Sequence, residues 1–407
     1  MASHNLHLIL AGDVIESAGT RSYLREMMRH LSRAGVDLHT HFFQFRLHDD
    51  LPSGECRIED FDAPVFLARG GWWFRVLPRP VYRLFERLVL WRFLRCTLSR
   101  ITSQDVVIGT GCLGALHLGA GSLPGNSWWL KLGLIEEEGT SGIRYRIRKR
   151  IEAMHARGFT NRIVVSEPMG EFIAGEYGPA CGEQLILPCL VDLDRFPSIA
   201  DRQTLRQQLG LHNRFVLTYV GTASPWQCAP ETVAFFAMLL AKLPDACFWV
   251  FTPDRERFEA LLGNLPKESW KIDFKPHHEL ASLLPAADMG CLVRRRERVN
   301  RVASPLKFPE YLSCGLPVLI GPEVGSYSRR VSDRHLGVVI DPDQPDTWPQ
   351  AIEAIIAMRG DSEMRKRCRM EAEALSWQTF APQLAQAFAA DFRSENDSPP
   401  MEGTGAR

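Results

Sequence analysis

Short apolar runs alternate with amphipathic segments along most of this chain. Residues 6–13 (LHLILAGD) form an apolar run that ends in a turn, which is typical of a buried parallel strand. Leucine and methionine residues between 24 and 31 then recur at the spacing of one helical face, and residues 36–43 are again apolar. A strand, a helix and a second strand in this order predict a βαβ unit, from which parallel sheets are built.

The alternation continues to about residue 392, with one interruption. Strand-and-turn patterns recur at 104–111 and 162–178, and a short strand at 185–187 is followed by a proline and a polar stretch of weak periodicity up to residue 212. A second series of strands and helices begins with RFVLTYVGT at 214–222. We interpret the interruption as a link between two α/β domains.

The predicted fold class is therefore α/β, with two doubly wound, Rossmann-like domains that face each other across a cleft. We expect an N-terminal domain at 1–195 and a C-terminal domain at 196–378. A C-terminal helix at 379–392 is expected to pack back on the N-terminal domain, and the polar tail at 393–407 to be disordered. Such folds bind ligands at the carboxyl ends of their strands.

Composition excludes several other classes of protein. The 407 residues are 45% hydrophobic and 24% charged with a net charge of zero, which argues against a dedicated nucleic-acid binder. The ten cysteines form no C-x-x-C pair and no zinc-type spacing, so we expect no metal, and those inside apolar runs, such as Cys247 and Cys291, are expected to be buried thiols. Neither a signal-peptide pattern nor an apolar run of membrane-spanning length occurs, and we predict a cytoplasmic protein.

One stretch, SPLKFPEYLSCGLPVLIG, combines residues that suit an anionic ligand. Pro309 cannot lie deep in a helix, so the helix is predicted to begin at about Pro305–Lys307, with Ser304 or a neighbour as its cap. Gly315 is the predicted stop, and Glu310 falls near the first turn.

These residues permit two interpretations. A lysine beside the free amides of a helix start suits a diphosphate, and a nearby carboxylate can accept two hydrogen bonds from the vicinal hydroxyls of a ribose. A nucleoside-diphosphate sugar would use all of these groups. The alternative is a capped surface helix on which Lys307 and Glu310 form a weak i, i+3 pair, and the spacing alone leaves both open.

The stretch resembles the nucleotide-sugar segment of retaining glycosyltransferases with the GT-B fold, in particular family 4 (glycosyl transferases group 1). The likeness is close for a bacterial polysaccharide branch with a P-x-K-x-x-E-Y-L-x-x-G-L-P-V pattern. Other segments are similar to family elements in the same order, and they lie at 162–172, 187–196, 219–227, 277–295 and 375–380. The resemblance covers about 160–380 well and the first 160 residues loosely.

The resemblance implies a donor site in the C-terminal domain. Glu310 would bind the donor ribose, Lys307 and the amides near Ser304 would face the diphosphate, and the loop that follows Gly221 would border the donor. Positive charge for the leaving group would come from Arg294 or Arg295. The implied donor-binding residues are Glu310, Lys307, Ser304, Pro305, Gly221, Trp226, Gln227, Arg294 and Arg295.

The chain departs from the family pattern at the catalytic position. Val302 stands eight residues before Glu310, where the family carries the first glutamate of its E-x7-E signature. The arginine and lysine that many members carry after the first strand of this domain are also absent from GTASPWQ. The catalytic residues therefore stay unassigned.

The N-terminal domain offers weaker candidates for an acceptor or phosphate loop. Gly19 and Thr20 resemble the glycine-bearing turn before the first long helix, although a glycine there also suits simple turn geometry. The stretch at 128–139 retains Gly133 and Glu137, whereas leucines at 130 and 132 replace the Asp and Arg of related enzymes.

A basic, aromatic segment suggests a surface partner. Arg69–Arg100 contains eight arginines and one glutamate, a net charge of +7, interleaved with aromatic residues. It suits an anionic inner-leaflet membrane surface, as in family members that glycosylate lipid-linked acceptors, and equally a solvated arginine face over a core helix. The basic cluster at 144–150 is interpreted as a solvated helix start.

Together these features predict a glycosyltransferase that moves a sugar from a nucleoside-diphosphate donor to a glycan or lipid-linked acceptor, in cell-surface polysaccharide synthesis. Retention of configuration and independence of metal are implied by the resemblance, and no D-x-D stands in a donor loop. No cofactor and no nucleic acid are expected. The alternatives are a sugar-nucleotide epimerase with the same fold and a catalytically inactive partner subunit.

Overall fold

The chain forms two compact α/β units. The computed structural model describes residues 5–11, 18–46, 54–57, 64–69, 79–111, 123–134, 142–196 and 201–396. The first unit comprises residues 1–163, 173–185 and 380–407, and the second comprises residues 164–172 and 186–379.

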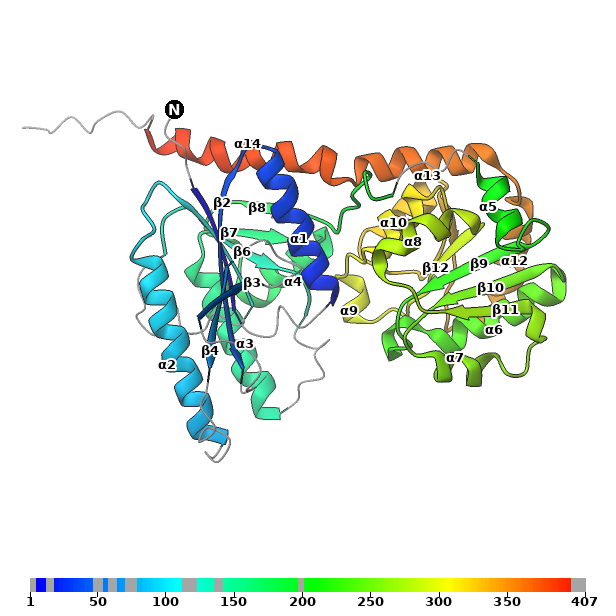
Figure 1. The fold of residues 1–407 in the computed structure, drawn as a ribbon, viewed down its shortest axis with the longest axis horizontal. Helices are drawn as coiled ribbons and strands as arrows, with labels where there is room; N and C mark the ends of the chain where they lie inside the picture. Colours follow the sequence, from blue (N-terminus) through cyan, green and yellow to red (C-terminus); the bar gives the residue numbers. More distant parts are fainter. Residues whose placement is uncertain are drawn as a thin grey trace, which may run out of the picture. The chain divides into compact units, whose positions relative to one another are not determined.

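The first unit is built on a sheet with the strand order β3-β4-β2-β1-β5-β6-β7-β8 (Figure 1). β1 pairs in parallel with β2 and β5, while the edge strand β3 runs antiparallel to β4. The strands are β1 (Asn5–Ala11), β2 (Asp37–Arg46), β3 (Gly54–Arg57), β4 (Pro64–Arg69), β5 (Val106–Gly111), β6 (Ser127–Lys131), β7 (Asn161–Val164) and β8 (Gln184–Ile186). The helices are α1 (Ala18–Arg33), α2 (Arg79–Leu98), α3 (Gly142–Gly158) and α4 (Glu167–Tyr177).

The apolar pattern explains the first βαβ unit. Leu8 and Ile9 of β1 are fully buried, as a central parallel strand requires. On α1, Leu24, Met27 and Leu31 are also fully buried. The strand, the helix and the parallel return strand predicted from the first 43 residues are therefore confirmed.

The second unit is built on a sheet with the order β11-β10-β9-β12-β13-β14, in which every neighbouring pair is parallel. Its strands are β9 (Phe215–Val220), β10 (Ala246–Phe251), β11 (Trp270–Asp273), β12 (Met289–Leu292), β13 (Val318–Ile320) and β14 (Gly337–Val339). Its helices are α5 (Arg202–Gln208), α6 (Ala229–Lys242), α7 (Arg255–Leu262), α8 (His277–Leu283), α9 (Arg298–Arg301), α10 (Lys307–Ser313), α11 (Tyr327–Asp333), α12 (Trp348–Ala357) and α13 (Ser362–Ala374).

Helices cover both faces of this second sheet (Figure 1). Phe308 and Tyr311 of α10 belong to the core on one face, together with residues of α8, α11 and α13. Phe235 of α6 and Phe258 of α7 belong to the core on the other face, together with residues of α12. This is the doubly wound arrangement that the sequence predicted.

The segment around residue 190 packs with the second unit, ten residues earlier than the predicted boundary at 195. The Val191 amide donates to the carbonyl of Leu375 at 3.0 Å, and the Trp377 amide donates to the carbonyl of Val191 at 3.0 Å. Val191 is buried in the core of that unit. This pairing draws residues 186–195 away from the N-terminal domain to which the sequence analysis assigned them.

The last helix, α14, runs from Trp377 to Asn396 and is longer at both ends than the predicted 379–392. Its residues from 380 onward belong to the first unit. Phe388 of this helix meets the buried Trp128 of β6 edge to face, with ring centroids 5.7 Å apart. An apolar contact therefore fixes α14 to the first sheet. Residues 397–407, in the predicted tail, lie outside the described residues.

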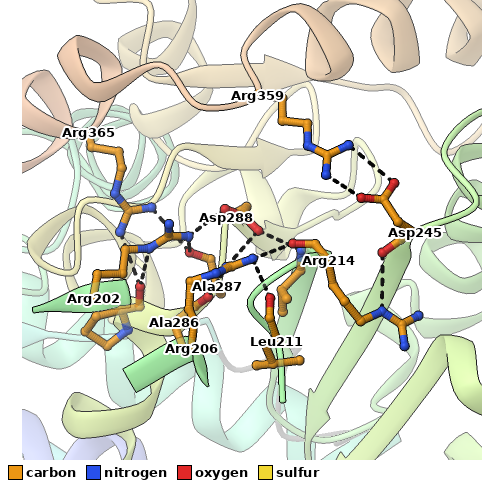
Figure 2. A network of polar contacts seen from close by, with 12 residues as sticks. Arg202, Arg206, Leu211, Arg214, Asp245, Ala286, Ala287, Asp288, Arg359 and Arg365 are labelled. Carbon is orange, nitrogen blue, oxygen red and sulfur yellow. Dashed lines mark hydrogen bonds and ion pairs between the residues drawn. The ribbon is translucent and has the colours of Figure 1, made fainter. Parts of the chain in front are cut away.

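An arginine network anchors α5 at the amino ends of the second sheet's strands (Figure 2). The carboxylate of Asp288 accepts from Arg202 at 2.5 Å, from Arg206 at 3.0 Å and from the backbone amide of Val216 at 2.8 Å. Arg202 and Arg365 also donate to backbone carbonyls between 285 and 287. Because these guanidinium groups are bound to backbone and carboxylate oxygens, we assign the network a structural role.

Candidate functional site

The helix that carries the predicted donor residues begins two residues later than the earliest predicted start. α10 starts at Lys307, and Leu306 before it already has helical geometry. Ser304 does not cap this helix, contrary to the prediction. A capping hydroxyl reaches only amides two or three residues ahead, and Ser304 lies too far upstream of the first helical residue.

Ser304 instead holds a loop of the second unit. Its hydroxyl accepts from the amide of Cys189 at 2.8 Å and shares a hydrogen bond of 2.8 Å with the Tyr327 hydroxyl. Pro305, which follows, is partly buried and has no amide hydrogen to offer a ligand. Ser304 and Pro305 therefore support the site by holding its backbone in place.

Lys307 meets the loop that follows β9. Its ammonium group donates to the side-chain oxygen of Gln227. Gly221, the first residue after β9, has a φ of +138°. A Cβ at that position would overlap the Lys307 ammonium and would lie 3.0 Å from the Gln227 oxygen. Gly221, Gln227 and Lys307 thus form one cluster at the carboxyl end of the central strand β9, although Lys307 lies 80 residues after Gln227 in the chain.

The environment of Lys307 disfavours its charged form. Burial first and the positive charge of Arg294 second lower the pKa of the ammonium group to about 7, while Glu310 acts in the opposite direction. The ammonium also lies 5.7 Å from the centre of the Tyr219 ring. A polyanion bound here would supply the missing counter-charge. Since α10 has only seven residues, its dipole contributes little beside this full charge.

Glu310 is turned into the protein, not toward bulk water. The residue is 5% exposed, and its Oε1 lies 2.5 Å from Nε2 of His277, the first residue of α8. An ionised carboxylate only accepts hydrogen bonds, so the histidine proton must lie on Nε2. The interpretation of Lys307 and Glu310 as an exposed i, i+3 pair is therefore wrong.

The loop after Gly221 is held by a chain of side-chain hydrogen bonds. The Gln227 amide donates to the Thr222 hydroxyl at 2.9 Å, and that hydroxyl pairs with Ser224 at 2.8 Å. The carboxylate of Asp254 accepts from the Ala223 amide at 2.7 Å. Because Gln227 donates through its nitrogen to Thr222, its oxygen is directed to Lys307.

Trp226 lies in the 3-10 turn Pro225–Gln227 of the same loop and is partly buried. Sequence reasoning did not identify Asp254 or His277 as site residues. Asp254 could have been found, because it follows a strand at its carboxyl end. His277 begins the segment 277–295 that resembles a family element, but the resemblance gave it no role, and only the fold brings it to Glu310.

Three consecutive arginines after β12 have different surroundings. Arg295 is held by Glu231 at 2.5 Å and Asp343 at 2.8 Å, and these carboxylates raise its pKa. Arg294 instead donates to the Asn300 side chain at 3.3 Å, and its charge acts on Lys307 and Tyr219. Of the two predicted candidates, Arg294 therefore lies with the Lys307 cluster, whereas Arg295 is engaged by carboxylates.

The position of the absent glutamate is apolar and buried. Val302 is 2% exposed, and its carbonyl accepts from the hydroxyl of Ser166 at 2.7 Å. Ser166 also caps the start of α4 by accepting from the amide of Met169 at 3.1 Å. A hydrogen bond to the backbone thus fixes this position, and its side chain offers no acid–base group.

The predicted N-terminal candidates differ in their placement. Gly19 and Thr20 lie inside the first turn of α1, not in a turn before it, because the helix already begins at Ala18. Gly133 follows β6, two residues after Lys131, whose ammonium group pairs with the buried Glu152 of α3. Glu137 lies outside the described residues.

The fold of the chain matches that of solved glycosyltransferases over nearly its whole length. A sucrose-phosphate synthase from Thermosynechococcus elongatus aligns with a TM-score of 0.71 and 19% identity, covering 96% of this chain and 100% of that one. HepE from Anabaena, solved in complex with UDP and glucose, aligns with a TM-score of 0.68 and 14% identity, covering 95% and 100%. The protein therefore has the two-domain α/β fold of the GT-B class. The cleft expected between the domains stays a prediction.

Sequence comparison finds a family match in the second unit. Residues 201–375, less than half of the chain, match the family described as glycosyl transferases group 1. A D-inositol 3-phosphate glycosyltransferase from Geodermatophilus obscurus is 28% identical over 232 residues, which are 54% of this chain and 50% of that protein. The chain spans about half the length of the curated relatives it matches.

Proposed function

We propose that this protein transfers a sugar from a nucleoside-diphosphate sugar to a glycan or lipid-linked acceptor, in cell-surface polysaccharide synthesis. The observation that carries the proposal is the cluster of Lys307, Gly221 and Gln227 at the carboxyl end of β9. Glu310 lies buried one turn further along the same helix. The cluster lies within the segment that matches the group 1 family.

In this proposal the diphosphate binds beside Lys307. The anion restores the full charge of the ammonium group, and Arg294 adds a second cation nearby. Gly221 leaves the phosphate oxygens access to the backbone, since no Cβ separates them. The ribose hydroxyls bind Glu310.

Stabilisation of the departing diphosphate is the main catalytic contribution in this scheme. The bond between the anomeric carbon and the phosphate oxygen breaks as Lys307 and Arg294 offset the charge that develops on that oxygen. The acceptor hydroxyl forms the new bond and releases its proton to the leaving phosphate. Because Val302 supplies no carboxylate, we propose attack from the face that the leaving group vacates, with retention. These two cations supply the charge for departure, so we propose that the reaction is metal-independent.

The neighbours suggest which donors to try first. HepE was solved with UDP and glucose, and a trehalose-6-phosphate enzyme from E. coli was solved with UDP-2-fluoro glucose. We therefore propose UDP-sugars as the first class of donor to test, followed by GDP-sugars.

We also propose that the protein acts at an anionic membrane surface. None of the helices within the described residues is long and apolar enough to cross a bilayer, so association would be peripheral. On α2, Leu88 is 56% exposed, and Arg95 lies 5.2 Å from the ring of Trp91. Exposed apolar residues that alternate with arginines suit a lipid headgroup layer.

Calorimetry with UDP and GDP, followed by transfer assays, tests the proposal. Glu310→Ala is expected to weaken binding of the preferred nucleotide by roughly 1–3 kcal/mol, as loss of a charged hydrogen-bonding group should. The matched control is Glu363→Ala, which removes an exposed carboxylate of α13 and should leave affinity unchanged. Failure of both nucleotides to bind at millimolar concentration would contradict the donor site. It would favour an inactive partner subunit, an alternative that is consistent with the buried, apolar Val302 at the family's catalytic position.

Product analysis distinguishes a transferase from the remaining alternative, a sugar-nucleotide epimerase. An epimerase would use the carboxylate and histidine of Glu310 and His277 as acid and base on the sugar itself. Incubation with the nucleotide sugar alone should therefore return the donor unchanged. Epimerised donor in the absence of an acceptor would contradict the transferase.

A further inference from the structure

The carboxylate of Glu310 has one oxygen held by the protein and one that is not. Oε1 is bound by Nε2 of His277 at 2.5 Å. Among the described residues, no donor reaches Oε2, although the Glu310 side chain is only 6% exposed. Oε2 is not fully enclosed by the protein, so it can accept hydrogen bonds from a ligand with hydroxyl donors.

The ring of His277 is itself held from a second side. Phe196, which is 4% exposed, meets it edge to face, with ring centroids 6.0 Å apart and an interplanar angle of 63°. His277 begins α8, directly after Pro276, whose fixed φ restricts the backbone there. The Phe196 ring and the Glu310 carboxylate thus hold the histidine from two sides, with Nε2 pointing at Oε1, although its side chain is 37% exposed.

We infer that His277 is the positioning residue that sets the selectivity of this site for ribose over deoxyribose. It binds Oε1, fixes the plane of the carboxylate, and leaves Oε2 directed to the vicinal hydroxyls of the nucleoside. The inference rests on the proposed function, because it assumes that a nucleoside diphosphate occupies the site. It adds a role for a residue to which the family resemblance assigned none.

The orientation of the Glu310 carboxylate determines how well it binds a diol. A carboxylate accepts two hydroxyl hydrogen bonds well only when its plane is aligned with the diol, and a free side chain loses rotamer entropy on binding. His277 fixes that rotamer before the ligand arrives, so less binding energy is lost in ordering it. Removal of the histidine should therefore weaken recognition of the diol and leave recognition of the diphosphate intact.

Calorimetry with three probes tests the inference. The wild-type protein should bind UDP (or GDP, whichever it prefers) about tenfold or more tightly than the corresponding 2′-deoxynucleoside diphosphate. His277→Phe and His277→Asn should remove most of this ratio, while the affinity for inorganic pyrophosphate should stay within about twofold of wild type. His277→Gln, whose amide can still donate to Oε1, should retain part of the selectivity.

The outcomes separate this inference from the proposal on which it rests. If neither nucleotide nor pyrophosphate binds the wild-type protein, the proposed donor site is wrong. If the nucleotide binds and the ribose-to-deoxyribose ratio is unchanged in folded His277→Phe and His277→Asn, the role of His277 is wrong and the donor site stands. Equal losses for the nucleotide and for pyrophosphate would show general damage to the site and would also overturn the inference. Thermal melting of each variant identifies those that fold.

Discussion

The space beside the Lys307 ammonium exists because residue 221 is a glycine. Its φ of +138° is one that residues with side chains rarely adopt, and a Cβ there would overlap the ammonium group. We expect Gly221→Ala to lower nucleotide affinity at least tenfold and to destabilise the protein by about 1–3 kcal/mol, since both backbone strain and a steric clash result. Calorimetry and thermal melting measure the two effects.

Gly210→Ala is the matched control for backbone strain. Gly210 also has a positive φ, +68°, but a Cβ there would meet nothing within 4 Å. This substitution should lower the melting temperature through strain alone and leave nucleotide affinity unchanged. If both alanine variants bind the nucleotide like wild type, Gly221 does not border the donor.

Lys307 makes nucleotide binding depend on pH. Its pKa is lowered to about 7 in the free protein, by burial first and by the charge of Arg294 second, while Glu310 opposes both. A bound diphosphate favours the charged ammonium and raises the pKa again. Below pH 7 the Lys307 amine already carries its proton. Above pH 7 the amine must take up a proton each time a diphosphate binds. Affinity should therefore fall from about pH 7 to pH 9.

Titration calorimetry at several pH values measures this dependence. Other groups near Lys307 do not mask it: Tyr219 has a pKa raised by burial and stays neutral in this range. Arg294→Gln removes one cause of the lowered pKa, so the decline in affinity should begin at a higher pH in that variant. An affinity that is constant from pH 7 to pH 9 would contradict the coupling.

Sequence reasoning brought Lys307 and Gly221 into one proposed site, and the structure places them side by side, because the fold gathers loops at the carboxyl ends of parallel strands. That they bind a donor stays a prediction. The resemblance could not choose between Arg294 and Arg295, since the choice depends on Glu231 and Asp343, which are distant in sequence. The assignment of Ser304 as a helix cap failed because two residues of turn precede α10.

At the scale of elements, α5 is attached to the second sheet by charge as well as by apolar contacts. Asp288 lies between Arg202 and Arg206 of that helix and also accepts from the backbone amide of Val216 (Figure 2). Asp288→Ala would leave two guanidinium groups and one strand amide without this acceptor. Since Asp288 is about one-fifth exposed, we expect a loss of about 2–3 kcal/mol, less than for a fully buried ion pair.

Chemical unfolding followed by circular dichroism measures that loss. Glu363→Ala is the control, because Glu363 pairs with Lys366 on the surface of α13 and should contribute less than about 1 kcal/mol. Nucleotide affinity should not change in Asp288→Ala, because the network lies at the amino ends of the strands. A midpoint equal to that of the control would show that apolar packing alone holds α5.

The elements themselves were more predictable than their boundaries. Fully buried parallel strands appear as uninterrupted apolar runs, so β1, β9 and β10 could be identified from composition alone. The boundary near 195 was misplaced because Val191 pairs with Leu375 and Trp377, a contact between segments about 185 residues apart. No local pattern encodes a pairing of that range.

At the scale of the whole molecule, the GT-B class followed from the order of elements and motifs, but the exposed apolar side chains did not. The cluster at 144–150 was interpreted as a solvated helix start, and it does lie in the first turns of α3, with Arg146 and Arg150 exposed. In the structure, Ile143 and Ile147 of α3 are 75% and 43% exposed and lie one helical turn apart. Arg146 and Arg150 each lie three residues after one of these isoleucines. This surface of α3 therefore combines apolar and basic side chains.

We expect α3 to contribute to the proposed membrane association, because exposed isoleucines enter the acyl boundary while neighbouring arginines meet anionic headgroups. Sedimentation with vesicles of phosphatidylglycerol and phosphatidylcholine, compared with phosphatidylcholine alone, measures it. The double variant Ile143→Ser/Ile147→Ser should lose part of the binding at any ionic strength. Arg146→Glu/Arg150→Glu should reduce the preference for anionic vesicles, because the arginines of α2 remain, and added salt should weaken wild-type binding through screening. Phe274→Ser, which removes a single exposed aromatic of the second unit, is the control and should bind like wild type. Equal sedimentation of wild type and both double variants would contradict a membrane role for α3, because neither its apolar nor its basic side chains would then contact the lipid.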